Sequence, residues 1–158
     1  MIDNFDKGAA AGWRFVSDRV MGGVSDGSVQ YLTGSEGAFA RLEGQVSTAN
    51  NGGFIQFRRD INSAFPASSN GLKLRVRGNG QKYYVHLRPA EARRPWHFFQ
   101  ASFEAGPEWQ NVKLDWSDFS PQGDTTMIFD QSMVTSIGIV AYGADYSAQV
   151  DVGQIDVE

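Results

Sequence analysis

Residues 72–88 are Leu72-Lys73-Leu74-Arg75-Val76-Arg77-Gly78-Asn79-Gly80-Gln81-Lys82-Tyr83-Tyr84-Val85-His86-Leu87-Arg88. Apolar and basic side chains alternate before the glycine-rich turn, and apolar and polar side chains alternate again after it. Successive side chains of a β-strand point to opposite faces, so a period of two indicates a strand. This stretch therefore predicts two strands, each with one buried face and one polar face.

Similar short runs recur along the chain between turns rich in glycine and asparagine. They predict further strands at Ser28–Leu32, Ala38–Val46, Phe54–Arg59, Phe98–Phe103, Asn111–Asp115, Ser136–Ala141 and Gln149–Val157. Many short strands with regular turns are typical of an all-β sandwich of two antiparallel sheets, or jelly roll. Helix is expected only as short turns, at Ile61–Ala67, Ser117–Phe119 and Ser132–Val134, the last with Asp130 as its cap.

Composition narrows the class of protein. The 158 residues contain no repeat, linker or low-complexity tract, which predicts a single domain over residues 1–158. The absence of cysteine excludes disulfides, thiolate metal sites and cysteine nucleophiles. A net charge of −4 argues against nucleic acid as a partner. No apolar run approaches the roughly 20 residues of a membrane span. The first residues lack a signal-peptide pattern, so we expect a cytoplasmic protein.

Positive charge is concentrated in one part of the chain. Residues 54–97 hold nine basic and two acidic side chains. If the strands pair in chain order, the polar faces of 54–59, 72–77 and 83–88 form one basic and aromatic surface. That surface is either a solvated sheet face or a concave binding face for a polar or anionic ligand, which arginine suits through its paired donors. Its candidate binding residues are Arg58, Arg75, Arg77, Tyr84, His86, Arg88 and Trp96, with Gln56, Phe98 and Gln100 beside them.

The loop after Trp13 contains the densest motif. Gly23-Val24-Ser25-Asp26-Gly27 matches the G-x-S-x-G form of a hydrolase nucleophile elbow. That elbow needs a helix after the serine, whereas an alternating, strand-like run follows here. We therefore interpret Gly22-Gly23 as a tight turn, with Asp18 and Ser25 accepting hydrogen bonds from the amides of the loop. Alternatively, Asp18 and Arg19 present a polar pair at the rim of the sandwich.

Three further features point more strongly to structure than to chemistry. Asn51-Gly52-Gly53-Phe54 predicts either a hairpin-type turn or a plain turn that leads into a strand. His86 and His97 have no metal-ligand spacing, and no cofactor is predicted. The acidic residues near the ends, Asp3, Asp6, Asp151 and Asp156, would gather oxygen ligands suited to calcium if the first and last strands paired, but ordinary solvated termini explain them as well.

The loop motif resembles the signature of the CIA30 family, the complex I intermediate-associated protein 30 proteins, in Ser17-Asp18-Arg19-Val20-Met21-Gly22-Gly23-Val24-Ser25. Further segments are similar to other motifs of the family. They are Ile2-Asp3-Asn4-Phe5; Asn51-Gly52-Gly53-Phe54 with Arg58; Trp109, Val112, Leu114 and Ser117-Asp118-Phe119; and Ser136-Ile137-Gly138-Ile139 with the closing strand Val152–Val157. The resemblance implies a galactose-binding-like β-sandwich without catalytic residues. It also implies a role in assembling the respiratory NADH:ubiquinone oxidoreductase. The motif positions that carry over are Asp18, Met21, Gly22, Gly23, Ser25, Asn51, Gly52, Gly53 and Arg58.

Two functions therefore remain open. One is a non-catalytic assembly module that holds a protein partner, such as an intermediate of a membrane complex, with the basic face and the loop containing Asp18, Arg19, Met21 and Ser25. The other is a binder of carbohydrate or of a small polar or anionic ligand in the same face. An enzyme is not expected, because no nucleophile, base and orienting group can be assembled from the spacing.

Overall fold

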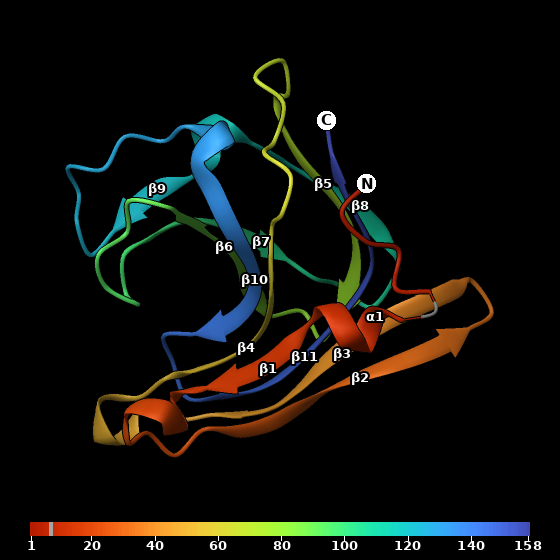
Figure 1. The fold of residues 1–158 in the computed structure, drawn as a ribbon. Helices are drawn as coiled ribbons and strands as arrows, with labels where there is room; N and C mark the ends of the chain where they lie inside the picture. Colours follow the sequence, from red (N-terminus) through yellow and green to blue (C-terminus); the bar gives the residue numbers. More distant parts are fainter. Residues whose placement is uncertain (7) are drawn as a thin grey trace.

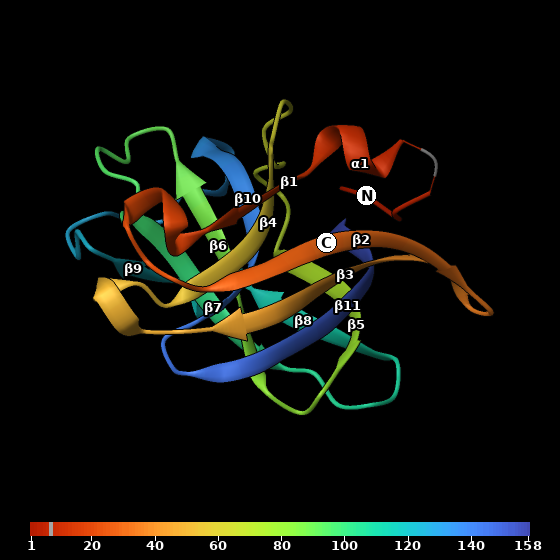
Figure 2. The ribbon, with the colours of Figure 1, turned by 90° about the horizontal axis from the view of Figure 1, so that it is seen from below.

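The strands of the computed structural model form two antiparallel sheets that face each other across one core (Figure 1; Figure 2). The structure describes residues 1–6 and 8–158. The six-stranded sheet has the order β1 (Arg14–Ser17), β4 (Phe54–Asp60), β10 (Val134–Tyr142), β6 (Lys82–Pro89), β7 (Phe98–Glu104) and β9 (Ser120–Gln122). The five-stranded sheet has the order β2 (Asp26–Gly34), β3 (Gly37–Val46), β11 (Tyr146–Val157), β5 (Gly71–Gly78) and β8 (Gln110–Asp115).

Helix is limited to short turns. They are α1 (Ala9–Gly12), η1 (Asp18–Met21), η2 (Ala49–Asn51), η3 (Trp116–Asp118) and η4 (Gln131–Met133). The helical turns predicted near 117–119 and 132–134 are confirmed, and Asp130 caps η4 by accepting a hydrogen bond from the Ser132 amide. The turn predicted over Ile61–Ala67 is wrong, since no helix forms there. Among the described residues, no helix is long and apolar enough to cross a membrane.

Alternation of apolar side chains builds the core. The residues buried between the sheets include Phe57, Leu72, Leu74, Val76, Val85, Leu87, Phe99, Phe103, Leu114, Ile137 and Ile139. Phe15 and Val112 pack at the margin and are half-buried. The all-β jelly roll of two antiparallel sheets is therefore confirmed.

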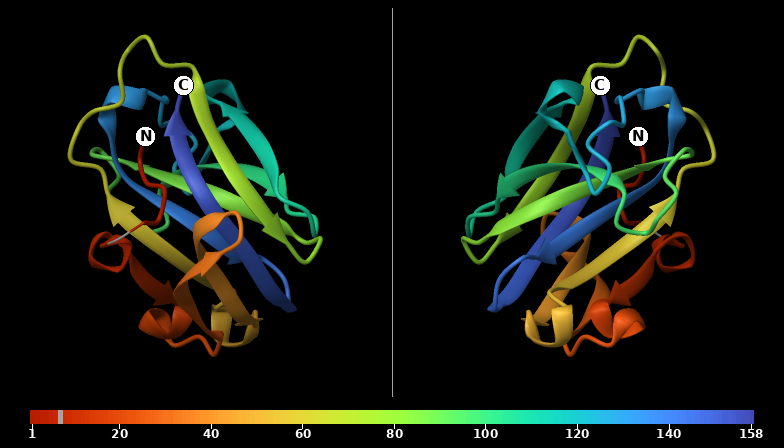
Figure 3. Two further views of the ribbon diagram at one scale, coloured as in Figure 1. Left: turned by 90° about the vertical axis from the view of Figure 1, so that its right-hand side faces the viewer. Right: turned by 90° about the vertical axis from the view of Figure 1, so that its left-hand side faces the viewer.

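Neighbouring strands in the chain do not always pair, and this corrects the predicted basic surface. The Gly78-Asn79-Gly80 turn leads from β5 in one sheet to β6 in the other, where β6 pairs with β10 and β7. Figure 3 shows the molecule from opposite sides. Arg75 and Arg77 therefore lie on the five-stranded sheet, away from Tyr84 and Arg88 on the six-stranded sheet. The prediction of one continuous face over 54–59, 72–77 and 83–88 is wrong.

The turn at Asn51-Gly52-Gly53 also crosses between the sheets. It connects β3 to β4, which belong to different sheets, so the hairpin interpretation is wrong and the plain turn leading into a strand is the correct one. The crossing brings the backbone of Gly52 and Gly53 under the loop that follows β1, and Gly53 has a φ of 132°, which favours glycine.

Two of the four acidic residues near the chain ends, Asp3 and Asp151, pair with basic groups, whereas Asp6 and Asp156 accept hydrogen bonds from the side-chain amides of Asn4 and Gln154. Asp3 bridges Ile155 and accepts hydrogen bonds from the Trp13 indole and from Arg59. Asp151 is buried between Arg41 and Arg77. Within residues 1–6 and 8–158, no three acidic or histidine side chains gather as metal ligands.

Candidate functional site

The loop after β1 is held from inside by the carboxylate of Asp18, which is fully buried. It accepts hydrogen bonds from the amide and hydroxyl of Ser25 at 2.9 and 2.5 Å, and from the amides of Gly53 and Phe54 at 2.5 and 3.2 Å. Burial alone would raise the pKa of Asp18. The hydrogen bonds from Ser25, Gly53 and Phe54 together outweigh it and lower the pKa below its ordinary value. The carboxylate is therefore charged, and its hydrogen bonds clamp the β1–β2 connection to the β3–β4 connection.

The glycines of the motif leave room for this clamp. A Cβ atom on Gly23 would lie 2.4 Å from the Asp18 carboxyl carbon, and one on Gly52 would lie 2.4 Å from its Oδ2. Gly22, at the end of η1, has a φ of 88°. The predicted tight turn at Gly22-Gly23 is confirmed, and so is the use of Asp18 to bind the amides of the loop.

Ser25 takes part in the same network. Its hydroxyl donates to Asp18 and accepts from the Ser47 amide at 2.9 Å, and the residue is fully buried. Strand β2 begins at Asp26, directly after it, where a nucleophile elbow would need a helix. A nucleophile elbow would expose the Ser25 hydroxyl, whereas here this hydroxyl is buried and forms structural hydrogen bonds.

The outside of this loop is apolar. Val20 is 76% exposed, Met21 58% and Val24 43%, although all three are apolar side chains. The Arg19 side chain also binds back to the loop, through a bond from Nε to the Ser25 carbonyl at 3.0 Å. We call Val20, Met21 and Val24 the loop tip. The connection from β1 to β2 lies beside the connection from β3 to β4 at one end of the sandwich (Figure 3).

The outer face of the six-stranded sheet carries an aromatic cluster. The His86 ring stacks on Phe98 with centroids 3.9 Å apart, and Tyr84 meets Tyr142 edge-on at 4.6 Å. Gln100 joins the cluster, because its Oε1 accepts from the Tyr142 hydroxyl and lies 3.2 Å from His86 Nε2. Burial, reinforced by the charge of Arg58, lowers the pKa of His86 to about 3 against the opposing effect of Gln100. The imidazole is therefore neutral at physiological pH.

Three arginines border the same face at its other end. Arg14, Arg58 and Arg88 line a depression of about 570 Å³ together with Asp60, Asn62 and Ser136. The Arg58 guanidinium donates to the Ser136 hydroxyl. Burial, followed by the charges of Arg14 and Arg88, lowers the pKa of Arg58 below its ordinary value. We call this hollow the arginine depression.

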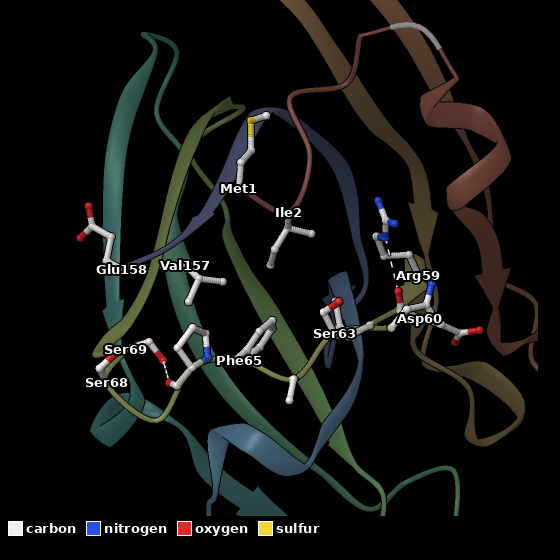
Figure 4. A pocket seen from close by; sticks show the side chains of 14 residues that line it. Met1, Ile2, Arg59, Asp60, Ser63, Phe65, Ser68, Ser69, Val157 and Glu158 are labelled. Carbon is white, nitrogen blue, oxygen red and sulfur yellow. Dashed lines mark hydrogen bonds between the residues drawn. The ribbon is translucent and has the colours of Figure 1, made fainter.

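A second hollow, of about 560 Å³, lies between the chain ends and residues 61–69 (Figure 4). Ile2, Phe65 and Val157 give it an apolar floor. Its arginine, Arg59, has a carboxylate partner in Asp3 at 3.3 Å. The two hollows differ in this respect, since Arg58 forms no ion pair within the part of the chain that the structure describes.

The sequence profile of complex I intermediate-associated protein 30 (CIA30) matches residues 4–152. The chain belongs to the CIA30 family. No curated protein matches it significantly.

Solved structures resemble this CIA30 chain in fold. The family 11 carbohydrate-binding module of the cellulosomal cellulase Lic26A-Cel5E of Clostridium thermocellum has a TM-score of 0.80 at 14% identity, covering 99% of this chain and 92% of that one. A family 11 module from the same organism, in complex with a β-1,3-1,4-mixed-linked tetrasaccharide, has a TM-score of 0.79 at 15% identity, covering 99% and 93%. A family 30 carbohydrate-binding module has 0.61 at 16% identity, covering 86% and 92%. These likenesses show a shared jelly-roll fold.

The CIA30 chain brings together only part of the predicted binding surface. Arg58, Tyr84, His86 and Arg88 do share the outer face of the six-stranded sheet, with Gln56, Phe98 and Gln100. Trp96 is 56% exposed in the connection between β6 and β7, and Asn51 lies in η2 beside the loop.

Arg75 and Arg77 are bound elsewhere in the CIA30 chain. The Arg75 guanidinium lies over the Trp109 ring at 4.2 Å, and Arg77 donates to Asp151 at 2.8 Å. Their predicted place in the binding face is wrong, because alternation assigns a residue to a face of its strand but not to a sheet.

Sequence reasoning missed several members of the face, among them Ser136, Arg14 and Tyr142. Arg14 belongs to β1, which is four residues long and was not predicted. Tyr142 is one residue beyond the strand expected at Ser136–Ala141 and pairs with Phe54. The unbroken apolar run that leads into Tyr142 was the available signal for the longer strand.

Proposed function

We propose that this CIA30 chain is a non-catalytic assembly module that holds a protein partner at the loop tip. The observation that carries the proposal is the orientation of the signature loop. Its polar groups turn inward onto Asp18, while Val20, Met21 and Val24 face solvent. The name of the family supports an intermediate of the respiratory NADH:ubiquinone oxidoreductase as the partner.

Rigidity makes such a loop suitable for binding a protein. Binding energy concentrates in a few apolar anchors, and anchors that are already ordered lose less conformational entropy on association. Four hydrogen bonds from two connections end on the Asp18 carboxylate, so the loop tip is fixed before a partner arrives. The Ser25 hydroxyl is enclosed by the same bonds, which supports a role without catalysis.

The test is capture of partners from an extract of the native cells. We expect subunits of the NADH:ubiquinone oxidoreductase to be retained by the wild type and depleted at least tenfold by Met21→Asp. Ile128→Asp is the matched control, because Ile128 is an exposed apolar side chain outside the loop. Equal recovery of these subunits by Met21→Asp and the control would refute the loop tip as the contact surface.

A second function is favoured by the outer face of the six-stranded sheet. Its aromatic cluster is combined with the polar side chains of Gln56 and Gln100, as in sites that hold sugars or other polar ligands. The likeness to carbohydrate-binding modules, one of them solved with a tetrasaccharide, supports this function through the fold.

Calorimetry with the mixed-linked tetrasaccharide tests the second function. Tyr84→Ala should weaken binding at least tenfold, whereas Arg75→Gln, on the other sheet, should leave it unchanged. If the wild type releases no heat of binding with millimolar tetrasaccharide, the face does not hold this neutral sugar.

A further inference from the structure

We infer that the arginine depression is a binding site for the oxyanion of a hydroxylated ligand, of the chemical class of a sugar acid. This site extends the second function proposed above and rests on it, because the aromatic cluster of the same face would hold the rest of the ligand. The oxyanion would lie among Arg14, Arg58 and Arg88, and a hydroxyl of the same ligand would donate to Gln56.

The charges of the depression are unbalanced. Three arginines border it, and among the described residues that line it Asp60 is the one acid. Asp60 is 3.6 Å from Arg14, and both side chains are more than half exposed, so solvent weakens that pair. Arg58 and Arg88 have no carboxylate partner in the described part of the chain. An oxyanion would relieve the repulsion among the three cations.

Three other half-buried arginines among the described residues are neutralised by carboxylates, and a fourth, Arg75, lies over the Trp109 ring. Arg41 and Arg77 share Asp151, and Arg59 has Asp3. Arg58 differs from them because it has no carboxylate partner in the described part of the chain. It is also partly desolvated, and the cations Arg14 and Arg88 lie near it. A desolvated charge without a counter-ion is costly for a fold, and the planar guanidinium fork fits a carboxylate or phosphate through two parallel hydrogen bonds. This contrast separates the arginine depression from an ordinary basic surface.

Unpaired buried atoms occur on one residue that lines the depression, Arg58, and on Gln56, which precedes it on the same face of β4. Among the described residues, buried side-chain atoms without a hydrogen-bond partner occur on Tyr31, Gln56, Arg58 and Tyr146. Two of these four residues, Gln56 and Arg58, are next to each other on the outer face of β4, roughly 7 Å apart along the strand. Arg58 Nε is a free donor for an oxyanion, and Gln56 Oε1 is a free acceptor for a hydroxyl.

Gly138 lies beside these two residues on the neighbouring strand β10. It pairs with Arg58 on one side and with His86 on the other, in the middle of the sheet. A Cβ atom at this position would lie 2.8 Å from Gln56 Oε1. A side chain at this position would therefore crowd Gln56 Oε1. A hydroxylated acid satisfies both the Arg58 donor and the Gln56 acceptor, whereas a neutral sugar leaves the arginines unpaired.

The test is an NMR titration of the ¹⁵N-labelled chain with D-glucuronate, D-glucose and inorganic phosphate in separate arms. We expect saturable shifts with glucuronate at the amides of Arg14, Arg58 and Ser136, weaker binding of phosphate at the same amides, and none of glucose. Arg58→Gln and Arg88→Gln should each weaken glucuronate at least tenfold. Lys113→Gln, which removes a charge from the exposed side of the other sheet, should not.

Gln56→Leu separates the two contacts. It should weaken glucuronate several-fold and leave phosphate unchanged, because only the hydroxyl donates to Gln56. Absence of saturable shifts with both anions, or unchanged affinity in both arginine variants, would overturn the oxyanion site. Equal affinities for phosphate and glucuronate would overturn the sugar-acid class. Tetrasaccharide binding and partner capture are measured on the same arginine variants, so failure of the oxyanion site is distinguishable from failure of either proposed function.

Discussion

Asp18 binds Ser25 at two points, since one carboxylate oxygen accepts from the Ser25 amide at 2.9 Å and the other from its hydroxyl at 2.5 Å. The second oxygen also accepts from the amides of Gly53 and Phe54, which are 35 and 36 residues away. One buried side chain thus ties the β1–β2 connection to the β3–β4 connection. The exposed positions of Val20, Met21 and Val24 depend on this arrangement.

Replacing Asp18 should therefore destabilise the whole fold. Asp18→Ala leaves the donors of Ser25, Gly53 and Phe54 unpaired in the interior, and we expect a loss of about 3–5 kcal/mol in the free energy of unfolding. Urea denaturation measures it. Glu43→Ala, at an exposed position of β3, should change stability by less than about 0.5 kcal/mol. A loss for Asp18→Ala as small as that of the control would show that the clamp is not needed.

Alternation predicted the strands because it depends on side chains that are near in sequence. Leu72, Leu74 and Val76 are buried as expected, and so are Tyr83, Val85 and Leu87. The partner of each strand depends on contacts between distant segments. Nothing in the alternation of β5 distinguishes pairing with β6 from pairing with β11, so Arg75 was assigned to the wrong sheet.

The candidate site was predictable to a similar extent. A polar strand face identified Arg58, Tyr84 and Arg88, because these residues lie in long, regular strands. Arg14 lies in a strand too short to show a period. Strand β9 has only three residues and contains Pro121, which is tolerated because β9 is an edge strand. The sequence predicts that Asp18 binds amides of its own loop. It does not predict the bonds to Gly53 and Phe54, because these residues are distant in the sequence and no local pattern relates them to Asp18.

A buried ion cluster on the five-stranded sheet should be structural. Asp151 accepts two hydrogen bonds from Arg41, at 2.8 and 3.0 Å, and one from Arg77 at 2.8 Å. Arg77→Ala removes one charged partner, and the expected loss is about 1–3 kcal/mol in the free energy of unfolding. Arg94→Ala, at an exposed position, serves as the control. Thermal melts of the two variants that coincide with the wild type would contradict a structural role.

His86 should make the protein less stable in mild acid. Its pKa is about 3 in the folded chain and near 6.5 when unfolded. Between these values the unfolded state binds one more proton, so stability falls as pH decreases, by about 1.4 kcal/mol per pH unit for this group. Denaturation of His86→Gln should lack this part of the slope, whereas His97→Gln should keep it. Parallel pH profiles for wild type and His86→Gln would show that the imidazole is protonated in the fold.

Gly22 and Gly23 are adjacent, yet alanine should act on them for different reasons. Gly22 has a φ of 88° and no atom near a new Cβ, so Gly22→Ala introduces only backbone strain, about 1 kcal/mol. At Gly23 the Cβ would lie 2.4 Å from the Asp18 carboxyl carbon. The carboxylate would have to move and release its donors, with an expected loss of at least about 3 kcal/mol. Gly106→Ala, where the nearest atom is 3.9 Å away, is the control. If Gly23→Ala melts at the same temperature as Gly22→Ala, the carboxylate can shift without losing its bonds, and the loop is less rigid than protein binding at its tip requires.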